Sequence, residues 1–168
     1  MDSPGDLICL SYGSRASFEQ HDGPDGIHPE INRILTTARR LNSQLAVTGV
    51  LYYGGGCFFQ YLEGPADNVD RLYASICRDQ RHHDVERLTR RSIGKRRYPE
   101  WSMKFVGLER LVSEILRRHG IKTFDPFQFT PAIVDDLVLT CTKAPDHTPE
   151  TTRDSGQRRR GFLGRWFT

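Results

Sequence analysis

An amide side chain sits among large apolar residues in the stretch CFFQYLEG (Cys57–Gly64). The aromatic and branched side chains of this stretch, and the glycines before it, predict a β-strand. Because strand side chains alternate between two sides, Gln60 should point the same way as Phe58 and Leu62. A primary amide buried among apolar groups costs about 1–3 kcal/mol unless it is hydrogen-bonded. The chemistry of Gln60 therefore depends on which partners it meets on that side.

Two further polar side chains, Tyr12 and Asn42, are expected on the same side of the sheet. Tyr12 continues the inward row of a strand predicted over 6–12. Asn42 lies beside the apolar stripe of a helix predicted over 30–44. Taken singly, a core tyrosine, a helix-end asparagine and an edge-strand glutamine would be ordinary. Together they offer enough donors and acceptors to match a planar heterocycle with carbonyls and ring nitrogens, held between the helices.

Other motifs give weaker signals. The glycine run Gly54–Gly56 lacks the GxxxxGK[ST] pattern of a phosphate loop. His82 and His83 have no partner at a known metal-ligand spacing, so we expect no metal. Ser14 has no histidine partner that the sequence reveals, and no GxSxG element occurs. A basic group that includes Arg81, at the end of the second helix, would suit a phosphate or a ribose, or would be a solvated helix end.

The apolar spacing predicts the elements that position these residues. Strands are expected at 6–12, 46–53, 57–63, 85–93 and 101–107, and helices at 30–44 and 66–80. The order β-α-β-β-α-β-β predicts an α+β, ferredoxin-like fold with two helices over one face of a mainly antiparallel sheet. Trp101, Met103 and Phe105 are expected on one face of the last strand, toward the helices.

The other face of the sheet should carry Phe59 and Tyr61 and needs a cover. Short helices predicted at 111–119 and 131–139, with a turn at Asp125-Pro126 between them, are candidates. We therefore divide the chain into a ferredoxin-like domain, a C-terminal helical extension on the sheet, and a disordered basic tail. These parts comprise residues 1–110, 111–141 and 142–168.

Composition excludes several classes of function. The formal net charge of +3 over 168 residues gives no general case for nucleic-acid binding. The four cysteines lie far apart without a CxxC pair, which indicates free thiols in a reducing compartment. No apolar run reaches the roughly 20 residues of a membrane span. The first residues lack a secretion signal, so we expect a cytoplasmic protein.

Five motifs together resemble one known family. They are SYGS (11–14), Asn42 followed by TGVLYY (48–53), FFQYLEG (58–64), RDQRH (78–82) and W-x-M (101–103). In this order and spacing they resemble the BLUF domain, a blue-light sensor that uses FAD. The resemblance covers about residues 6–110, and the rest of the chain is similar, more loosely, to the C-terminal helices of short BLUF proteins.

The resemblance implies a noncovalent flavin, FAD with FMN as the alternative, between the two helices. Tyr12 would be the redox-active tyrosine. Gln60 would be the amide switch between Tyr12 and the flavin, rearranging by rotation or tautomerisation and shifting absorption to the red. Asn42 would bond the carbonyl side of the flavin, and Ile34 would pack near the ring. Ser14 would be a small hydroxyl near the glutamine.

Positions further along the chain carry less specific implications. Asp79, Arg81 and His82 match positions near the pyrimidine side or the ribityl-phosphate tail of the flavin. Trp101 and Met103 match the pair on the fifth strand that reports the switch.

The expected output is a change of contact, not a reaction. Residues 108–168 are too few for a cyclase or a phosphodiesterase, so we expect no enzyme in this chain. A downstream protein, or a homo-oligomer interface, would read the change. Two other hypotheses stay open: a flavin-dependent redox enzyme using the same pocket, and an RRM-like RNA-binding module with Phe59 and Tyr61 as stacking aromatics.

Overall fold

Every strand and helix predicted in the first 110 residues forms, with shifted ends. The computed structural model describes residues 6–19, 27–107 and 109–147. The elements are β1 (Leu7–Ala16), α1 (Pro29–Gln44), β2 (Thr48–Gly54), β3 (Cys57–Pro65), α2 (Ala66–Ile76), β4 (His82–Ser92) and β5 (Lys104–Val106). After β5 come α3 (Glu109–Arg118), the 3₁₀ turn η1 (Pro126–Gln128) and α4 (Pro131–Lys143).

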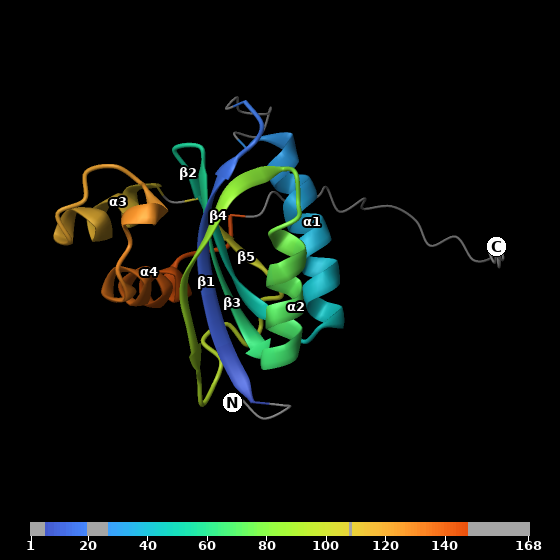
Figure 1. The fold of residues 1–168 in the computed structure, drawn as a ribbon. Helices are drawn as coiled ribbons and strands as arrows, with labels where there is room; N and C mark the ends of the chain where they lie inside the picture. The colour runs from blue at the N-terminus through green and yellow to red at the C-terminus, as the bar shows by residue number, and fades with distance from the viewer. Residues whose placement is uncertain (1–5, 20–26, 108, 148–168) are drawn as a thin grey trace, which may run out of the picture.

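The five strands form one sheet in the order β4-β1-β3-β2-β5. All neighbouring pairs are antiparallel except β2 and β5, which run parallel. Gly55 and Gly56 have φ of 57° and 75°, the left-handed values that close a tight hairpin between β2 and β3. Helices α1 and α2 lie together on one face (Figure 1). This confirms the predicted ferredoxin-like α+β fold.

The inner face of the sheet packs against α1 and α2 through aliphatic side chains. Ile31 and Leu35 face inward from α1, and Val69 and Leu72 from α2. They meet one row of the sheet, which includes Leu62 and is fully buried. These aliphatic contacts hold both helices against the sheet around Tyr12, Asn42 and Gln60.

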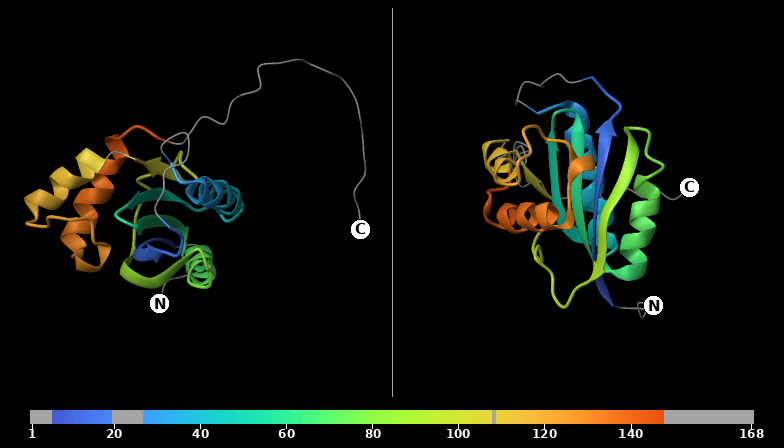
Figure 2. Two further views of the ribbon diagram at one scale, coloured as in Figure 1. Left: turned by 90° about the horizontal axis from the view of Figure 1, so that it is seen from above. Right: turned by 60° about the vertical axis from the view of Figure 1, so that its left-hand side comes forward.

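The outer face is covered by α3 and α4, as the sequence indicates (Figure 2). Phe59 and Tyr61 are only 2% and 3% exposed, and they share a cluster with Val134 and Leu137 of α4. The helices therefore occupy the surface on which nucleobases would stack. An RRM-like binding face is excluded by this burial.

Trp101 departs from its predicted place. The strand β5 begins at Lys104, because a turn precedes it in which the Trp101 amide donates to the Tyr98 carbonyl (3.2 Å). The alternation of the strand therefore does not extend back to Trp101. Its ring packs against the outer cluster, with the Lys104 ammonium 5.1 Å from the ring centroid. Met103, in contrast, lies on the inner face as predicted.

The segment after α4 is ordered as far as it is described. The helix continues to Lys143, and the His147 amide donates to the Phe105 carbonyl (2.8 Å). Residues 142–147 are thus structured, although they were predicted as part of a disordered tail. The remainder of that predicted tail, 148–168, lies outside the described residues.

Candidate functional site

A cavity of about 430 Å³ lies between the inner face of the sheet and helices α1 and α2. Its apolar walls are Ile34, Ala38, Leu41, Leu51, Phe58, Leu72 and Ile76, and its polar lining is Tyr12, Thr37, Asn42, Gln60, Ser75, Arg78, Asp79, Arg81 and His82. Volume and lining are typical of a site for a small organic ligand, in which few polar groups orient a mostly apolar contact. The structure brings the three polar residues of the sequence argument into one cavity.

The centre of the cavity is a hydrogen-bonded pair. Tyr12 and Gln60 face each other directly across β1 and β3, and the Tyr12 hydroxyl donates to Gln60 Oε1. Gln60 Nε2 points to Met103 Sδ at 3.4 Å. The amide therefore has the phenol on one side and a weak sulfur acceptor on the other. Reversing the amide would exchange these two contacts without moving the backbone.

Tyr12 stays protonated over the whole neutral range. Its side chain is buried, and this burial raises the pKa of the phenol well above its ordinary value of 10.0. The nearby Cys77 and Asp79 groups raise the pKa further. The phenol thus holds its proton in the hydrogen bond to Gln60 unless an electron is removed at the same time.

Asn42 is placed by the last turn of α1. It is 1% exposed, and its Nδ2 donates to the Ser102 carbonyl at 2.7 Å. This bond ties α1 to the segment before β5. It also fixes the amide plane of Asn42 where the side chain lines the cavity.

Asp79 and Arg81 form the polar rim after α2. The Asp79 carboxylate accepts from the Arg81 backbone N–H (2.9 Å) and from Arg81 Nε and Nη2 (3.0 and 2.5 Å). These bonds lower the pKa of the Asp79 carboxyl and raise the pKa of the Arg81 guanidinium. Asp79 therefore fixes the positively charged Arg81 guanidinium at the edge of the cavity, which Arg78 also lines.

Ser14 reaches His82 and is not bonded to Gln60. Its hydroxyl lies 2.8 Å from His82 Nδ1, while His82 Nε2 lies 2.7 Å from the Ile76 carbonyl. A carbonyl can only accept, so Nε2 carries the hydrogen and Nδ1 accepts from Ser14 in the neutral ring. Among the described residues that line the cavity Ser14 does not appear. It orients His82, which does line it.

The family model for sensors of blue-light using FAD (BLUF) matches residues 7–104. The chain belongs to the BLUF family. This span begins with β1 and ends at β5, and so includes every element that encloses the cavity. The resemblance stated from the five motifs is confirmed.

Several relatives support the assignment. The chain is 35% identical over 146 residues to photoactivated adenylate cyclase subunit beta of Euglena longa, covering 86% of this chain and 15% of that protein. It is 34% identical over 91 residues to BluF of Escherichia coli (strain K12), a blue light- and temperature-regulated antirepressor, covering 54% and 23%. The BlsA photo-activated state is similar with a TM-score of 0.76 at 30% identity, covering 83% of this chain and 97% of that one. The chain thus spans less than a quarter of the two longer relatives.

The lining residues of the BLUF cavity in this chain suit a flavin. Apolar walls from both helices and the sheet suit a flat ring system, and amides at Asn42 and Gln60 suit its carbonyl and nitrogen edge. The cations Arg78 and Arg81 lie at the end of α2, where a phosphate-bearing tail would find charge-assisted bonds.

One residue near the site was missed from sequence. Arg39 of α1 donates from Nε and Nη2 to the Met103 carbonyl (3.0 and 2.9 Å) and lies 3.6 Å from Asp146. Asp146 Oδ1 in turn accepts from the Phe105 amide (3.1 Å). These contacts lie over 40 residues apart in sequence, and no local pattern marks them. These contacts connect Met103, which lies next to Gln60, to Asp146 in the segment after α4.

Two further observations bound the site. Within residues 6–19, 27–107 and 109–147, no His, Cys, Asp and Glu side chains form a group of three or more suited to a metal ion. In the same described part of the chain, no helix has the length and apolarity to cross a membrane.

Proposed function

We propose that this BLUF protein senses blue light through a flavin held noncovalently in the cavity between α1, α2 and the sheet. The observation that carries the proposal is the direct hydrogen bond from Tyr12 to Gln60 in the cavity wall. FAD is the flavin that the family model names, with FMN as the alternative. Asn42 and Ile34 hold the ring end, and Asp79, Arg81 and His82 serve the pyrimidine side or the tail.

A bound flavin would supply the absorption of blue light and a strongly oxidising excited state. Tyr12 is the electron donor of this chain, because its phenol lies in the cavity wall. Its hydroxyl proton has a path to Gln60 Oε1, to which it is already hydrogen-bonded. The raised pKa of Tyr12 keeps this proton in place in the dark. Electron and proton therefore leave Tyr12 together.

Gln60 is the switch. When the electron and the proton have both returned to Tyr12, the amide would be left in a rearranged state, by rotation or by tautomerisation. In either case a different group of Gln60 would face the cavity. The changed hydrogen bond to a bound flavin would shift the absorption of the flavin to the red. The rearrangement would also change the contact between the Gln60 amide and Met103 Sδ.

The output runs from Met103 to the C-terminal helices. The Met103 carbonyl is held by Arg39, and Asp146 joins Arg39 to the β5 backbone. Trp101 and Lys104 continue this contact to the outer layer, where Lys104 Nζ donates to the Thr142 carbonyl at the end of α4 (3.1 Å). A displacement of Met103 would therefore reach both faces of β5.

The reader of the signal is a separate protein or a second copy of this chain. Relatives are described as cyclase subunits and as an antirepressor, so BLUF domains serve several kinds of effector. A flavin-dependent redox enzyme remains the alternative, and turnover of an electron donor in the dark would favour it. We expect no such turnover in this chain.

The test is the Gln60→Leu variant, compared with Gln44→Leu at the exposed end of α1. Both variants should bind FAD. Gln44→Leu should keep the reversible red shift under blue light, and Gln60→Leu should lose it. A red shift that persists in Gln60→Leu would refute the switch. A wild-type protein that stays colourless after addition of FAD would refute the proposed function.

A further inference from the structure

Gly13 lies on β1 between Tyr12 and Ser14, which hydrogen-bond to Gln60 and His82. The side of Gly13 on which a Cβ would stand faces the outer layer. A Cβ built on Gly13 would meet Pro126 Cβ at 2.6 Å and Cγ at 2.8 Å, closer than real side chains approach. Tyr12 and Ser14, its chain neighbours, point into the inner layer toward Gln60 and His82. Pro126 of η1 is therefore seated directly behind the photoactive part of β1.

The glycine is needed here for space and not for backbone conformation. The described glycines with positive φ are Gly55, Gly56 and Gly120, and Gly13 is not one of them. A glycine in ordinary strand conformation commonly marks a close approach by another segment. At Gly13 that segment is Pro126, which is itself buried.

The turn that presents Pro126 is rigid. Asp125 caps η1, accepting from the Phe127 amide (3.2 Å) and from Gln128 Nε2 (2.8 Å). The Phe129 amide donates to the Pro126 carbonyl (3.1 Å). A proline ring in a doubly capped turn cannot move aside without breaking these bonds, so a shift of β1 would be felt by the whole of η1.

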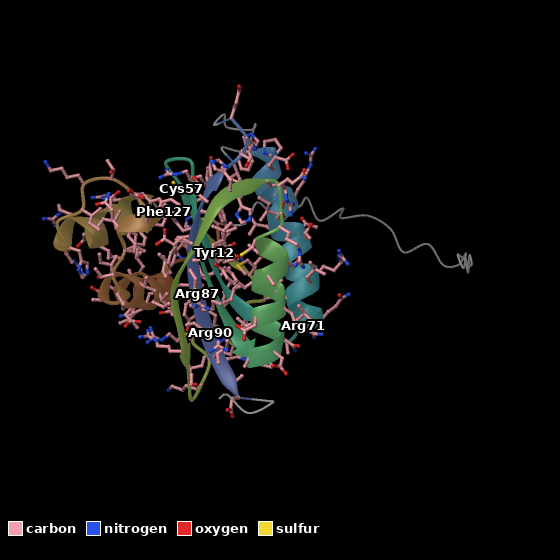
Figure 3. All side chains as sticks on the ribbon, in the orientation of Figure 1. Tyr12, Cys57, Arg71, Arg87, Arg90 and Phe127 are labelled. Carbon is pink, nitrogen blue, oxygen red and sulfur yellow. The ribbon has the colours of Figure 1, made fainter. Side chains whose placement is uncertain are left out.

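Aromatic contacts attach η1 to the sheet on both sides. Phe124 packs edge-on against Tyr52 of β2 (4.6 Å between centroids), and Phe129 against Phe59 of β3 (5.9 Å). The guanidinium of Arg15, at the end of β1, lies 4.6 Å from the centroid of Phe127. Figure 3 shows Phe127 beside this end of the sheet. The turn is thus a fixed part of the outer layer.

The pairing of β1 is irregular at the same point. Opposite β4 the register shifts between Ser11 and Tyr12 and again between Gly13 and Arg15, whereas opposite β3 it is regular. Such bulges loosen the ladder locally and are used to re-aim side chains next to active sites. Where the pairing with β4 is irregular, Pro126 lies against Gly13 from the outer face, in addition to the regular pairing of β1 with β3.

We propose that Pro126 on Gly13 is a positioning contact, which sets Tyr12 against Gln60 and carries the light-driven change through β1 to η1. This second route is separate from the one through Met103 and β5. The part that concerns light rests on the proposed function. The part that concerns position does not, because it is a property of the protein without a ligand.

The positional part is tested without flavin by four variants: Gly13→Ala, Pro126→Gly, both together, and Gly94→Ala. Gly94 is the matched control, since an added Cβ there would meet no atom within 4 Å. Gly13→Ala should speed hydrogen exchange of the amides of Phe127, Gln128 and Phe129 about tenfold or more. It should also move the side-chain amide resonance of Gln60, which a remote packing defect would leave in place.

Removal of the Pro126 ring separates a steric clash from the loss of the contact. Pro126→Gly alone should move the Gln60 resonance from its wild-type position, because the proposed support of β1 is lost. In the double variant the new methyl group has room, so Gln60 and the three amides should match the Pro126→Gly single variant. Gly94→Ala should match the wild type throughout. If Gly13→Ala leaves the Gln60 resonance where Gly94→Ala does, or if Pro126→Gly leaves it at the wild-type position, the positioning contact is refuted.

The light part uses the full chain loaded with FAD. Blue light should change the exchange of the three η1 amides in the wild type and in Gly94→Ala, and this difference should be lost in Gly13→Ala. A wild type that shows the red shift with unchanged η1 exchange refutes the β1 route and leaves the proposed function standing. A wild type that takes up no FAD refutes the proposed function, and the unliganded variants still decide the positioning contact.

Discussion

At the scale of single residues, the register of one strand pair explains why an amide sits among apolar side chains. Gln60 is directly opposite Tyr12 across β1 and β3, so its partner is supplied by the neighbouring strand. A slip of one residue would send Gln60 to the other face of the sheet. The cost of burying the amide is therefore offset by a bond that exists only in this register. Under the proposed function, the light switch and the strand pairing depend on the same contact.

Asp79 makes a prediction about acid stability. Its bonds to Arg81 hold the pKa of the carboxyl below the ordinary 3.8, so the ionised form stabilises the fold above that pH. This contribution is lost as the pH falls through the lower pKa of the folded state. Asp79→Asn should therefore destabilise the protein by about 1 kcal/mol at pH 7 and by less at pH 3. Urea denaturation at the two pH values measures the change.

The control for Asp79→Asn is Glu100→Gln, at an exposed position of the loop before Trp101. It should leave the urea midpoint unchanged at both pH values. An equal loss of stability for Asp79→Asn at pH 7 and pH 3 would show that the carboxylate charge does not act in the way described.

At the scale of elements, local patterns predicted what local interactions decide. Apolar periodicity located α1, and the glycines located the hairpin before β3, because both signals lie within a few residues of the structure they produce. The start of β5 was predicted at residue 101, but the strand begins at Lys104. The turn before it depends on the Tyr98 carbonyl, and the strand itself depends on pairing with β2. Trp101 followed that error to the wrong face.

The buried carboxylate of Glu63 is a second feature that the sequence did not predict. Glu63 of β3 is fully buried and accepts from the backbone amides of Arg97 (2.9 Å) and Tyr98 (2.6 Å), with the Tyr61 hydroxyl at 3.2 Å. The alternation of β3 places Glu63 on the outer face, but the two backbone amides that donate to it are more than 30 residues away. Sequence periodicity cannot reveal such a partner, so the carboxylate that anchors the 96–98 loop was not foreseen.

Arg39 makes a prediction about the attachment of β5. Arg39→Met keeps the length of the side chain and removes both bonds to the Met103 carbonyl. Hydrogen bonds to a charged group contribute about 1.5–3 kcal/mol, and each kcal/mol changes the melting temperature of a chain this size by about 2–4 °C. The melting temperature should fall by roughly 3–12 °C, and hydrogen exchange at Phe105 should accelerate.

Arg40→Met, one residue along α1 and exposed, is the matched control. It should change neither the melting temperature nor the exchange at Phe105. If both arginine variants behave alike, Arg39 does not hold β5, and the route from Met103 to Asp146 would have to be abandoned.

At the scale of the whole molecule, one sheet is shared by two layers with different tasks. The inner layer of α1 and α2 encloses the cavity, and the outer layer of α3, η1 and α4 buries the reverse face (Figures 1 and 2). The central strands carry one row of side chains to each layer, so a change at Tyr12 or Met103 can reach the outer layer through the sheet that both layers share. Under the proposed function, the outer layer is therefore the surface on which we expect a partner to read the light state.

Buried phenols on both faces of that sheet predict how the molecule responds to alkali. Burial raises the pKa of Tyr12 on the inner face and of Tyr61 and Tyr98 on the outer face well above 10.0. Above pH 10 the unfolded chain loses these protons and the folded protein keeps them, so stability falls as the pH rises. For one such group the loss is about 1.4 kcal/mol per pH unit.

Tyr98→Phe isolates one of these groups, because its hydroxyl donates to the Val138 carbonyl (2.5 Å) and bonds nothing in the cavity. The variant should be about 1 kcal/mol less stable than the wild type at pH 8, since a buried acceptor loses its donor. Between pH 10 and pH 11 it should lose about 1 kcal/mol less than the wild type, so that the two unfolding curves converge. Urea midpoints at pH 8, 10 and 11 measure this. Parallel pH profiles for the two proteins would mean that Tyr98 ionises in the folded state as readily as in the unfolded chain, and that the outer layer does not keep water from it.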